Sequence, residues 1–277
     1  MTNSIFIAVL LTCHNRKEKT LACLKALYQC DVPENYIFEV FLVDDGSTDG
    51  TSEVIGHKFP LVNLIQGDGN LYWNRGMHLA WEIASKAKDF DYYLWLNDDT
   101  FLTKEAFHTL LSQTFAKAIV CGATQSKATH EITYGGFGKN PDRLIAPDGS
   151  FQESDYCNGN CVLIPRAVFK VLGNLDPVFH HAVGDFDYSG RAKKMGIELF
   201  VAPQFIGTCE SHDSVPKWRS PSVSIVARLK SLYSASSGCY PPEFFVFEKR
   251  HNGFFMAVFH YFSTHLRAII PQLWKID

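Results

Sequence analysis

The chain has 277 residues, of which 46% are hydrophobic and 20% are charged, and its formal net charge is −3 at pH 7. These values are typical of a globular protein with one large core or two smaller ones, and they exclude a fibrous or disordered chain. They give no indication of a nucleic-acid partner. The charge is uneven, because residues 214–277 carry eight Lys or Arg against three Asp or Glu. A basic, aromatic-rich tail on an acidic body indicates contact with an anionic surface.

The eight cysteines show no spacing typical of a disulfide scaffold, which in a chain of this length indicates reduced, buried thiols and a cytosolic protein. A structural zinc ion bound by Cys157, Cys161, Cys209 and His212 is the alternative, although the two pairs lie far apart in the sequence. The apolar run at 5–11 is too short to cross a bilayer and follows no basic residue. We therefore expect a protein that is soluble or bound at a membrane surface.

Apolar runs alternate with amphipathic helical patterns through the first hundred residues. Strands are predicted at 5–12, 37–43, 61–66 and 92–97, and helices at 18–30 and 74–88. This alternation predicts an α/β fold with a parallel, doubly wound sheet flanked by helices.

Acidic residues follow two of these predicted strands. Asp44 and Asp45 end the second strand, and Asn97-Asp98-Asp99 end the fourth. Right-handed crossovers bring the carboxyl ends of parallel strands to one edge, where open α/β sheets bind ligands. Paired carboxylates at that edge suit Mg²⁺ or Mn²⁺ holding a phosphate, and the sequence contains no glycine-rich phosphate loop. The alternative is that the second acidic pair caps the next helix.

The pattern after residue 100 is less regular. A helix is predicted at 103–115, turns of an antiparallel insertion at 134–138 and 147–149, and strands at 156–165 and 197–202. A further helix is predicted to open near Asp185 and to end at Gly196.

Four short motifs occur in order along the chain: Leu-Leu-Thr-Cys-His-Asn-Arg at 10–16, Val-Asp-Asp-Gly-Ser-Thr-Asp-Gly-Thr at 43–51, Asn-Asp-Asp at 97–99 and Gly-Asp-Phe-Asp-Tyr at 184–188. Over residues 4–212 the chain thereby resembles the family 2 glycosyltransferases. The resemblance implies the GT-A fold, with a smaller mixed sheet on the acceptor side, and an inverting reaction that uses a nucleotide sugar. On this basis we expect a catalytic domain at 1–213, with a nucleotide-binding half at 1–100 and an acceptor half at 101–213, and a helical extension at 214–277.

The resemblance also implies roles for individual residues. Asp185 takes the place of the general base that removes the proton of the acceptor hydroxyl, with Asp187 as the second choice and a helix N-cap as the structural alternative. Asp99 would hold Mn²⁺ or Mg²⁺, and His212 is a candidate further ligand. Two positions depart from the family pattern, because Asn97 and Gly184 stand where relatives carry acids.

The remaining implied contacts concern the donor and the acceptor. Thr12 and Asp45 would hold a pyrimidine base, Asp98 the ribose, and Asn74 and Arg75 the region of the phosphates. The full donor set is Thr12, Asn15, Arg16, Asp45, Asn70, Trp73, Asn74, Arg75 and Asp98. The expected acceptor contacts are Asn158, His181, Asp187 and Trp218, where the alternative for the aromatic residues is ordinary half-burial.

The sequence around 71–76 is similar to that of rhamnosyl-type transferases, which adds a dTDP-sugar to a UDP-sugar as the expected donor. The expected acceptor is a glycan or a lipid-linked glycan of capsule or O-antigen type. Two rival functions are a sugar nucleotidyltransferase of similar fold and an inactive nucleotide- or glycan-binding module. The nucleotidyltransferase would need a glycine-rich basic loop after the first strand, which residues 14–17 do not provide.

The segment at 252–274 is rich in Phe, Leu and Ile and has Arg250, Arg267 and Lys275 near it. It predicts an interfacial amphipathic helix that brings a cytoplasmic enzyme to the inner face of the membrane. The alternative is a helix packed on the catalytic domain or on a second subunit. Pro271 limits the helix at its far end.

Overall fold

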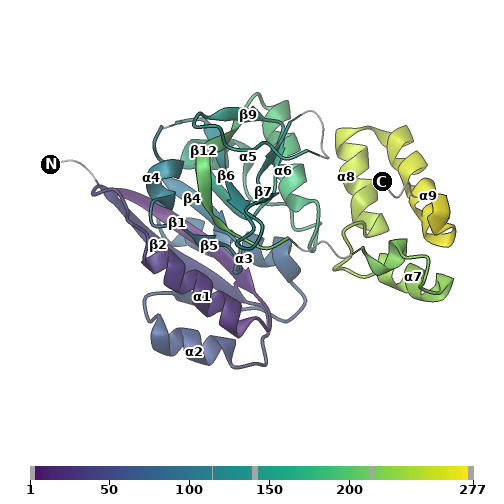
Figure 1. The fold of residues 1–277 in the computed structure, drawn as a ribbon, viewed down its shortest axis with the longest axis horizontal. Coiled ribbons are helices and arrows are strands. Elements are labelled where there is room, and N and C mark those ends of the chain that lie inside the picture. The colour runs from purple at the N-terminus through teal and green to yellow at the C-terminus, as the bar shows by residue number, and fades with distance from the viewer. Residues whose placement is uncertain (1–3, 114, 139–142, 212–214, 274–277) are drawn as a thin grey trace.

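The computed structural model describes residues 4–113, 115–138, 143–211 and 215–273 (Figure 1). Within these residues ten strands form one mixed sheet, with the central order β3-β2-β1-β4-β11-β6-β12-β5, to which β7 and β9 add at β6 and β12. The strands are β1 (Ile5–Cys13), β2 (Tyr36–Asp44), β3 (Asn63–Gln66), β4 (Tyr92–Leu96), β5 (Phe101–Leu102), β6 (Ala118–Gln125), β7 (Ile132–Tyr134), β9 (Gln152–Ser154), β11 (Cys161–Pro165) and β12 (Glu198–Thr208). A separate antiparallel pair consists of β8 (Gly136–Phe137) and β10 (Tyr156–Cys157).

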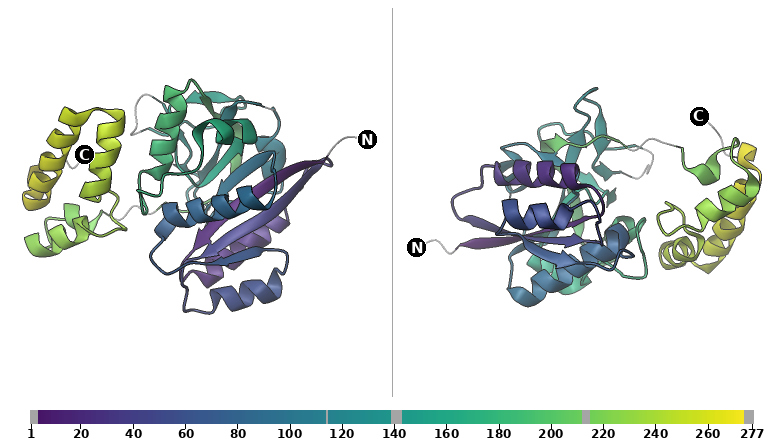
Figure 2. Two further views of the ribbon diagram at one scale, coloured as in Figure 1. Left: turned by 180° about the vertical axis from the view of Figure 1, so that it is seen from behind. Right: turned by 90° about the horizontal axis from the view of Figure 1, so that it is seen from below.

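Helices lie on both faces of the sheet, and the helices at the C-terminal end of the chain lie beside it (Figure 2). They are α1 (Lys17–Tyr28), α2 (Thr51–Lys58), α3 (Tyr72–Ala87), α4 (Ala106–Leu110), α5 (Arg166–Leu172), α6 (Gly184–Lys194), α7 (Ile225–Leu232), α8 (Pro241–His251) and α9 (Phe254–Ile269). No helix in the described ranges is both long enough and apolar enough to cross a bilayer.

Alternation along β1 explains why helices cover both faces. Ile7, Val9 and Leu11 point into one hydrophobic core, which α1 covers, whereas Ala8 and Leu10 point into the other, which α3 covers. Strands buried on both faces are continuous apolar runs, which is the pattern the sequence shows. The predicted α/β fold is confirmed.

The sheet is parallel throughout its first half, whereas in the other half only β6 and β12 pair in parallel. Strands β3, β2, β1 and β4 pair in parallel, but β11 enters antiparallel between β4 and β6. The predicted strand at 156–165 is divided into β10 and β11, and the predicted helix at 103–115 is reduced to α4. Cys13 is in register with Asp44, so the segments that follow β1, β2 and β4 meet at one edge.

Helices α7, α8 and α9 form a C-terminal helical unit (residues 215–273) beside α6 (Figure 1). Trp218 lies in its small core with Leu232 and Ala268 and is only 5% exposed. Its ring therefore fills the interior of this unit, and the predicted acceptor contact at Trp218 is not supported.

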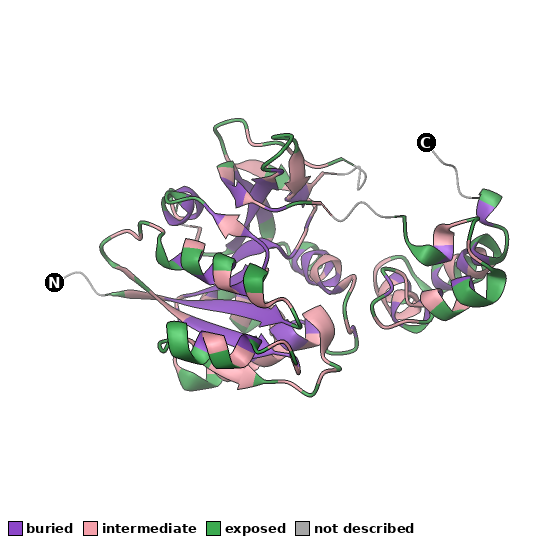
Figure 3. Cartoon of the chain, turned by 60° about the horizontal axis from the view of Figure 1, so that its bottom comes forward, coloured by how far each residue is buried: buried purple, intermediate pink, exposed green. Residues whose placement is uncertain are grey.

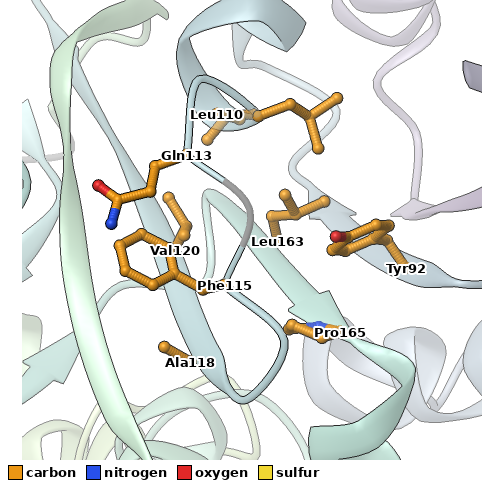
Figure 4. A pocket seen from close by; sticks show the side chains of 9 residues that line it. Tyr92, Leu110, Gln113, Phe115, Ala118, Val120, Leu163 and Pro165 are labelled. Atoms are coloured by element: carbon orange, nitrogen blue, oxygen red, sulfur yellow. The ribbon is translucent and has the colours of Figure 1, made fainter. Parts of the chain in front are cut away.

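A small apolar void lies beneath α4, lined by Leu110, Phe115, Val120 and Leu163 among others (Figure 4). Its volume is about 10 Å³, which is room for about one water molecule. A ligand of the size of a nucleotide sugar must bind elsewhere.

Candidate active site

A cleft of about 760 Å³ opens at the carboxyl edge of the parallel strands. Its walls come from the ends of β1, β2 and β4, the start of α3, the segment between β10 and β11, and the start of α6. Of the residues predicted for the site, those that line it are Thr12, Arg16, Asp45, Trp73, Asp98, Asp99, Asn158, His181 and Asp185. His212 lies outside the described residues.

The two aspartates after β4 are held by one arginine. Arg16 Nη1 lies 3.1 Å from Asp98 Oδ1, and Arg16 Nη2 donates to Asp99 Oδ2. Asp98 also accepts a hydrogen bond of 3.1 Å from Thr20 Oγ1 on α1. Burial raises the pKa of Asp98 to about 6, although the positive charge of Arg16 opposes this. The positive charge of Arg16 therefore lies beside the carboxylates for which the sequence predicts a bound cation.

Asp185 faces the same cleft from the first turn of α6. Its Oδ2 accepts a hydrogen bond of 2.8 Å from Gly159 N, and its Oδ1 accepts one of 2.9 Å from Phe186 N. Burial raises the pKa of Asp185 to about 6, while these two backbone N–H groups oppose the rise. The carboxylate is thus fixed in orientation and close to the basicity that suits a general base near neutral pH.

Trp73 links the residue that precedes Asp98 to the glycine whose N–H donates to Asp185. Its Nε1 donates to Asn97 Oδ1 at 2.7 Å, and its ring lies against Gly159, where an added Cβ would be 2.3 Å from the ring. Asn97, the residue that replaces an acid of the family motif, is thereby used to position the tryptophan. Gly159 is required because only a residue without a side chain admits the ring here.

Asp45 holds the loop that leads into α3. Its carboxylate accepts hydrogen bonds from Gly69 N at 2.8 Å and from Leu71 N and Tyr72 N at 2.9 Å each. A carboxylate has about four lone-pair sites, so Oδ1, which accepts only one of these bonds, retains capacity for another donor. Structural anchoring is a role of Asp45 that the sequence did not suggest.

Two predicted donor residues support turns at the rim. Asn15 Oδ1 accepts from Thr48 N at 2.8 Å, and Asn15 N donates to Ser47 Oγ at 2.8 Å, which ties the end of β1 to the turn after β2. Asn70 is exposed and bonds to Asp68. Neither side chain lines the cleft, so direct contact with the donor is not supported.

Asn74 and Arg75 face away from the cleft. Asn74 is fully buried and donates to the carbonyl oxygens of Asp176 and Phe179 at 2.8 and 2.9 Å. Arg75 Nε donates to Pro177 O at 2.8 Å. These bonds attach α3 to the segment before α6, so the predicted donor contacts are replaced by a role in positioning that segment.

Asp187 is buried among side-chain nitrogen groups of two helices, α6 and α8. It contacts Arg191 Nε at 2.9 Å, Arg250 Nη1 at 2.8 Å and His251 Nε2 at 2.9 Å. Although burial opposes ionisation, the hydrogen bond from His251 and the charges of both arginines hold the pKa of Asp187 below its ordinary value. The alternative base at Asp187 and its acceptor role are not supported, because this carboxylate joins α6 to α8.

The cleft also contains residues that sequence reasoning missed. They are Tyr72, Gly159, Asn160, Ser236 and Gly238, among others. The segment Asn158-Gly159-Asn160 is visible in the sequence as a polar interruption of a strand. Ser236 and Gly238 carry no such signal, because only the folded chain brings the C-terminal helical unit to the cleft.

Strained backbone is concentrated around this cleft. Asn15, Tyr72 and Val183 have φ values of 51°, 56° and 60°. A positive φ is unfavourable for any residue with a side chain and is a genuine outlier for a β-branched one such as Val183. Such strain persists where the surrounding structure imposes it, which happens most often at functional sites.

The residues of the cleft suit Mg²⁺ or Mn²⁺ better than they suit Zn²⁺. Mg²⁺ and Mn²⁺ are commonly held by one or two carboxylates together with substrate phosphates. Asp98 and Asp99 can provide the carboxylates. Burial raises the pKa of the Cys161 and Cys209 thiols, so neither is a ready thiolate ligand. Among the described residues no cluster of three or more His, Cys, Asp or Glu is arranged for a metal ion.

A family model described as "Glycosyl transferase family 2" matches residues 8–173, more than half of the chain. The chain belongs to this family. The chain is 30% identical over 105 residues to a poly-beta-1,6-N-acetyl-D-glucosamine synthase from Staphylococcus epidermidis. The matched segment covers 36% of this chain and only 23% of that protein.

Solved structures show the same fold. The mannosyltransferase PcManGT from Pyrobaculum calidifontis, in complex with GDP-Man and Mn²⁺, aligns with 99% of this chain and 74% of its own, at 16% identity and a TM-score of 0.56. GalNAc-T7 with UDP, GalNAc and Mn²⁺ aligns with 95% of this chain and 58% of its own, at 13% identity and a TM-score of 0.54. The predicted GT-A fold and glycosyltransferase class are confirmed.

Proposed function

We propose that this glycosyltransferase moves a sugar, with inversion, from a UDP- or dTDP-linked donor to a hydroxyl of a glycan or lipid-linked acceptor. The observation that carries the proposal is the arrangement of the cleft. Asp98 and Asp99 line it at the end of β4, and Asp185 lines it from α6, so groups suited to the diphosphate and to the acceptor hydroxyl share one cavity.

Asp185 would act on the acceptor. As the hydroxyl oxygen attacks the anomeric carbon, the bond from that carbon to the phosphate oxygen breaks, and the nucleoside diphosphate leaves with the bonding electrons. The hydroxyl proton passes to Asp185, whose orientation is fixed by the N–H groups of Gly159 and Phe186. Attack on the face opposite the leaving group inverts the anomeric centre and requires no enzyme nucleophile.

The donor would occupy the strand ends. Thr12 and the remaining acceptor capacity of Asp45 are suited to a base with a ring N–H, and Asp98 to the ribose. Asp99 would hold Mn²⁺ or Mg²⁺, with His212 as the predicted further ligand. When bound, the cation would offset the charge that develops on the departing diphosphate.

Two features of the relatives support this donor chemistry and setting. The solved structures named above contain a nucleotide or nucleotide sugar together with Mn²⁺. The S. epidermidis relative is named as a polysaccharide synthase. We propose that this enzyme acts in polysaccharide assembly of capsule or O-antigen type, at the cytoplasmic face of the membrane, with residues 1–100 as the donor half and 101–213 as the acceptor half.

A thermal-shift panel tests the donor site. UDP, dTDP, GDP and CDP are each added with and without Mn²⁺, at about a hundredfold excess over Kd, where binding stabilises the fold by about 2.7 kcal/mol. We expect a metal-dependent shift with UDP or dTDP that is absent in Asp99→Asn. A shift with GDP alone would indicate a GDP-linked donor in place of a UDP- or dTDP-linked one. No shift with any nucleotide would favour the inactive binding module.

A further inference from the structure

Helix α9 of the C-terminal helical unit carries large apolar residues on its solvent-exposed face. Phe255, Phe259, Phe262, Leu266 and Ile269 recur at intervals of three or four residues, so they form one stripe along the helix. All are exposed, from 88% for Phe255 to 44% for Ile269. Figure 3 shows that exposed residues cover much of the C-terminal helical unit. The outer face of α9 is therefore hydrophobic along its whole length, about 24 Å at 1.5 Å per residue.

The inner face of the same helix buries only small residues completely, and half-buried His260, Tyr261 and His265 make its other contacts with the unit. Ala257, Thr264 and Ala268 are the buried residues of α9. A surface helix that served only to cover a core would show the opposite arrangement. The alternative that this segment simply packs on the catalytic domain is thus not supported, because its largest side chains point to solvent.

The orientation of α9 is fixed from within. Arg228 of α7 is buried and donates to Ala268 O at 2.6 Å and Ile269 O at 2.9 Å, the last carbonyl groups of α9. These bonds satisfy orphan acceptors at the helix end and fasten α9 to α7. The apolar stripe cannot turn inward without breaking them.

The exposed charge of this unit is of one sign. Its acidic residues in the described range, Glu243 and Glu248, are buried, and they bond to His180 and Asn252. Lys217, Lys230, Lys249 and Arg267 are exposed. A second copy of the chain would bring like charges together, whereas an anionic surface would complement them.

We propose that the outer face of α9 is a docking surface for an anionic lipid bilayer, in which α9 lies flat with its apolar stripe among the acyl chains and the basic side chains of the unit face the headgroups. Ser236 and Gly238 of the same unit line the cleft, so docking would hold the cleft beside the membrane surface. This location suits the lipid-linked acceptor of the proposed function, although binding to a bilayer does not require that function.

Vesicle flotation tests the docking. The full chain is mixed with vesicles of phosphatidylcholine alone or with about 30% phosphatidylglycerol, at low salt and at about 0.5 M NaCl, where exposed charges are screened. We expect flotation with the anionic vesicles, weakened by salt. We also expect Lys230→Gln to lower the partition coefficient about fivefold, the effect of about 1 kcal/mol per basic residue near the surface.

The decisive variant is Phe259→Ser with Phe262→Ser, and its control is Leu61→Ser, which alters a residue that is 80% exposed on the catalytic domain. We expect the double variant to lose flotation by on the order of tenfold or more and the control to float like wild type. Equal flotation of all three proteins, or no flotation of the wild type, would overturn the proposal. So would a stable dimer in solution that the double variant dissolves.

A measurement of nucleotide binding distinguishes a failure of the docking proposal from a failure of the proposed function. The thermal shift with nucleotide and Mn²⁺ should be the same for wild type and the double variant, which also verifies folding. Loss of flotation with retained nucleotide binding supports docking, whereas flotation without any nucleotide binding would contradict only the donor site.

Discussion

The guanidinium of Arg16 lies between the carboxylates of Asp98 and Asp99, with Nη1 3.1 Å from Asp98 Oδ1 and Nη2 donating to Asp99 Oδ2. Both acids are nearly buried, at 4% and 6% exposure. This arginine therefore supplies positive charge to two adjacent buried carboxylates.

Substitution Arg16→Ala should lower the free energy of unfolding by about 3 kcal/mol at neutral pH without metal, because two buried carboxylates lose the arginine that they share. Mn²⁺ should recover part of this loss by occupying the same position. Urea denaturation with and without Mn²⁺ measures both effects. The control is Arg166→Ala, whose partner Asp91 is 31% exposed and whose loss should cost less than about 1 kcal/mol. Equal effects of the two variants would contradict the role of Arg16.

The rate of transfer should depend on pH through Asp185, whose pKa burial raises to about 6. A general base acts when deprotonated, so kcat should fall about tenfold per unit below that pH and level off above it. The pKa of Asp98 is also raised to about 6, which affects donor binding in the same range. The profile must therefore be measured at saturating donor and metal. A kcat that does not change between about pH 5 and 7 would exclude a base of this pKa.

Substitution Gly159→Ala should impair the site while the fold persists. The new Cβ would lie 2.3 Å from the ring of Trp73 and 3.5 Å from Asp185 Cβ, so the tryptophan must move. Displacement of a positioning group by about 1 Å commonly costs about a hundredfold in rate, and we expect kcat/KM to fall by that order. Gly138→Ala is the matched control, because no atom of the described residues lies within 4 Å of its added Cβ. Comparable activity of the two variants would show that the ring can be accommodated elsewhere.

Substitution Asp187→Ala should destabilise the protein by about 3 kcal/mol, because it removes the buried carboxylate that Arg191, Arg250 and His251 share, although Arg250 keeps its ion pair with Asp176. The pKa of Asp187 is lowered, so its contribution is present above the ordinary value of about 3.8 and is lost as the pH falls through the lower folded value. Unfolding measured at pH 7 and below pH 4 should show the difference from wild type shrinking at acid pH. Asp155→Ala serves as control, since its partner Lys193 is 54% exposed and the expected loss is below about 1 kcal/mol.

The parallel half of the sheet was predictable because its signals are local. The buried runs of β1, β2 and β4 and the acids that follow them are contiguous in the sequence, and crossover handedness places their ends together. The antiparallel entry of β11 between β4 and β6 has no such signal. It depends on pairing between residues far apart in the chain, such as Val162 with Cys121.

The residues of the candidate site also differ in whether local sequence signals reveal their role. Asp98, Asp99 and Asp185 were identified from motifs and line the cleft as expected. Asn74 and Arg75 match the family pattern equally well, but the structure uses them to bind carbonyl groups about a hundred residues away, at 176–179. Sequence patterns indicate which residue types are present at a site, whereas long-range hydrogen bonds decide which of them remain available to a ligand.

The role of Asp185 as general base is tested by the rate at which Asp185→Asn releases nucleoside diphosphate, compared with wild type. The assay uses the donor that the thermal-shift panel selects and an acceptor glycan. We expect kcat to fall by about 10²–10⁴-fold while donor binding, measured by thermal shift with Mn²⁺, is unchanged. A variant that turns over its donor at the wild-type rate would contradict the assignment of Asp185 as the base.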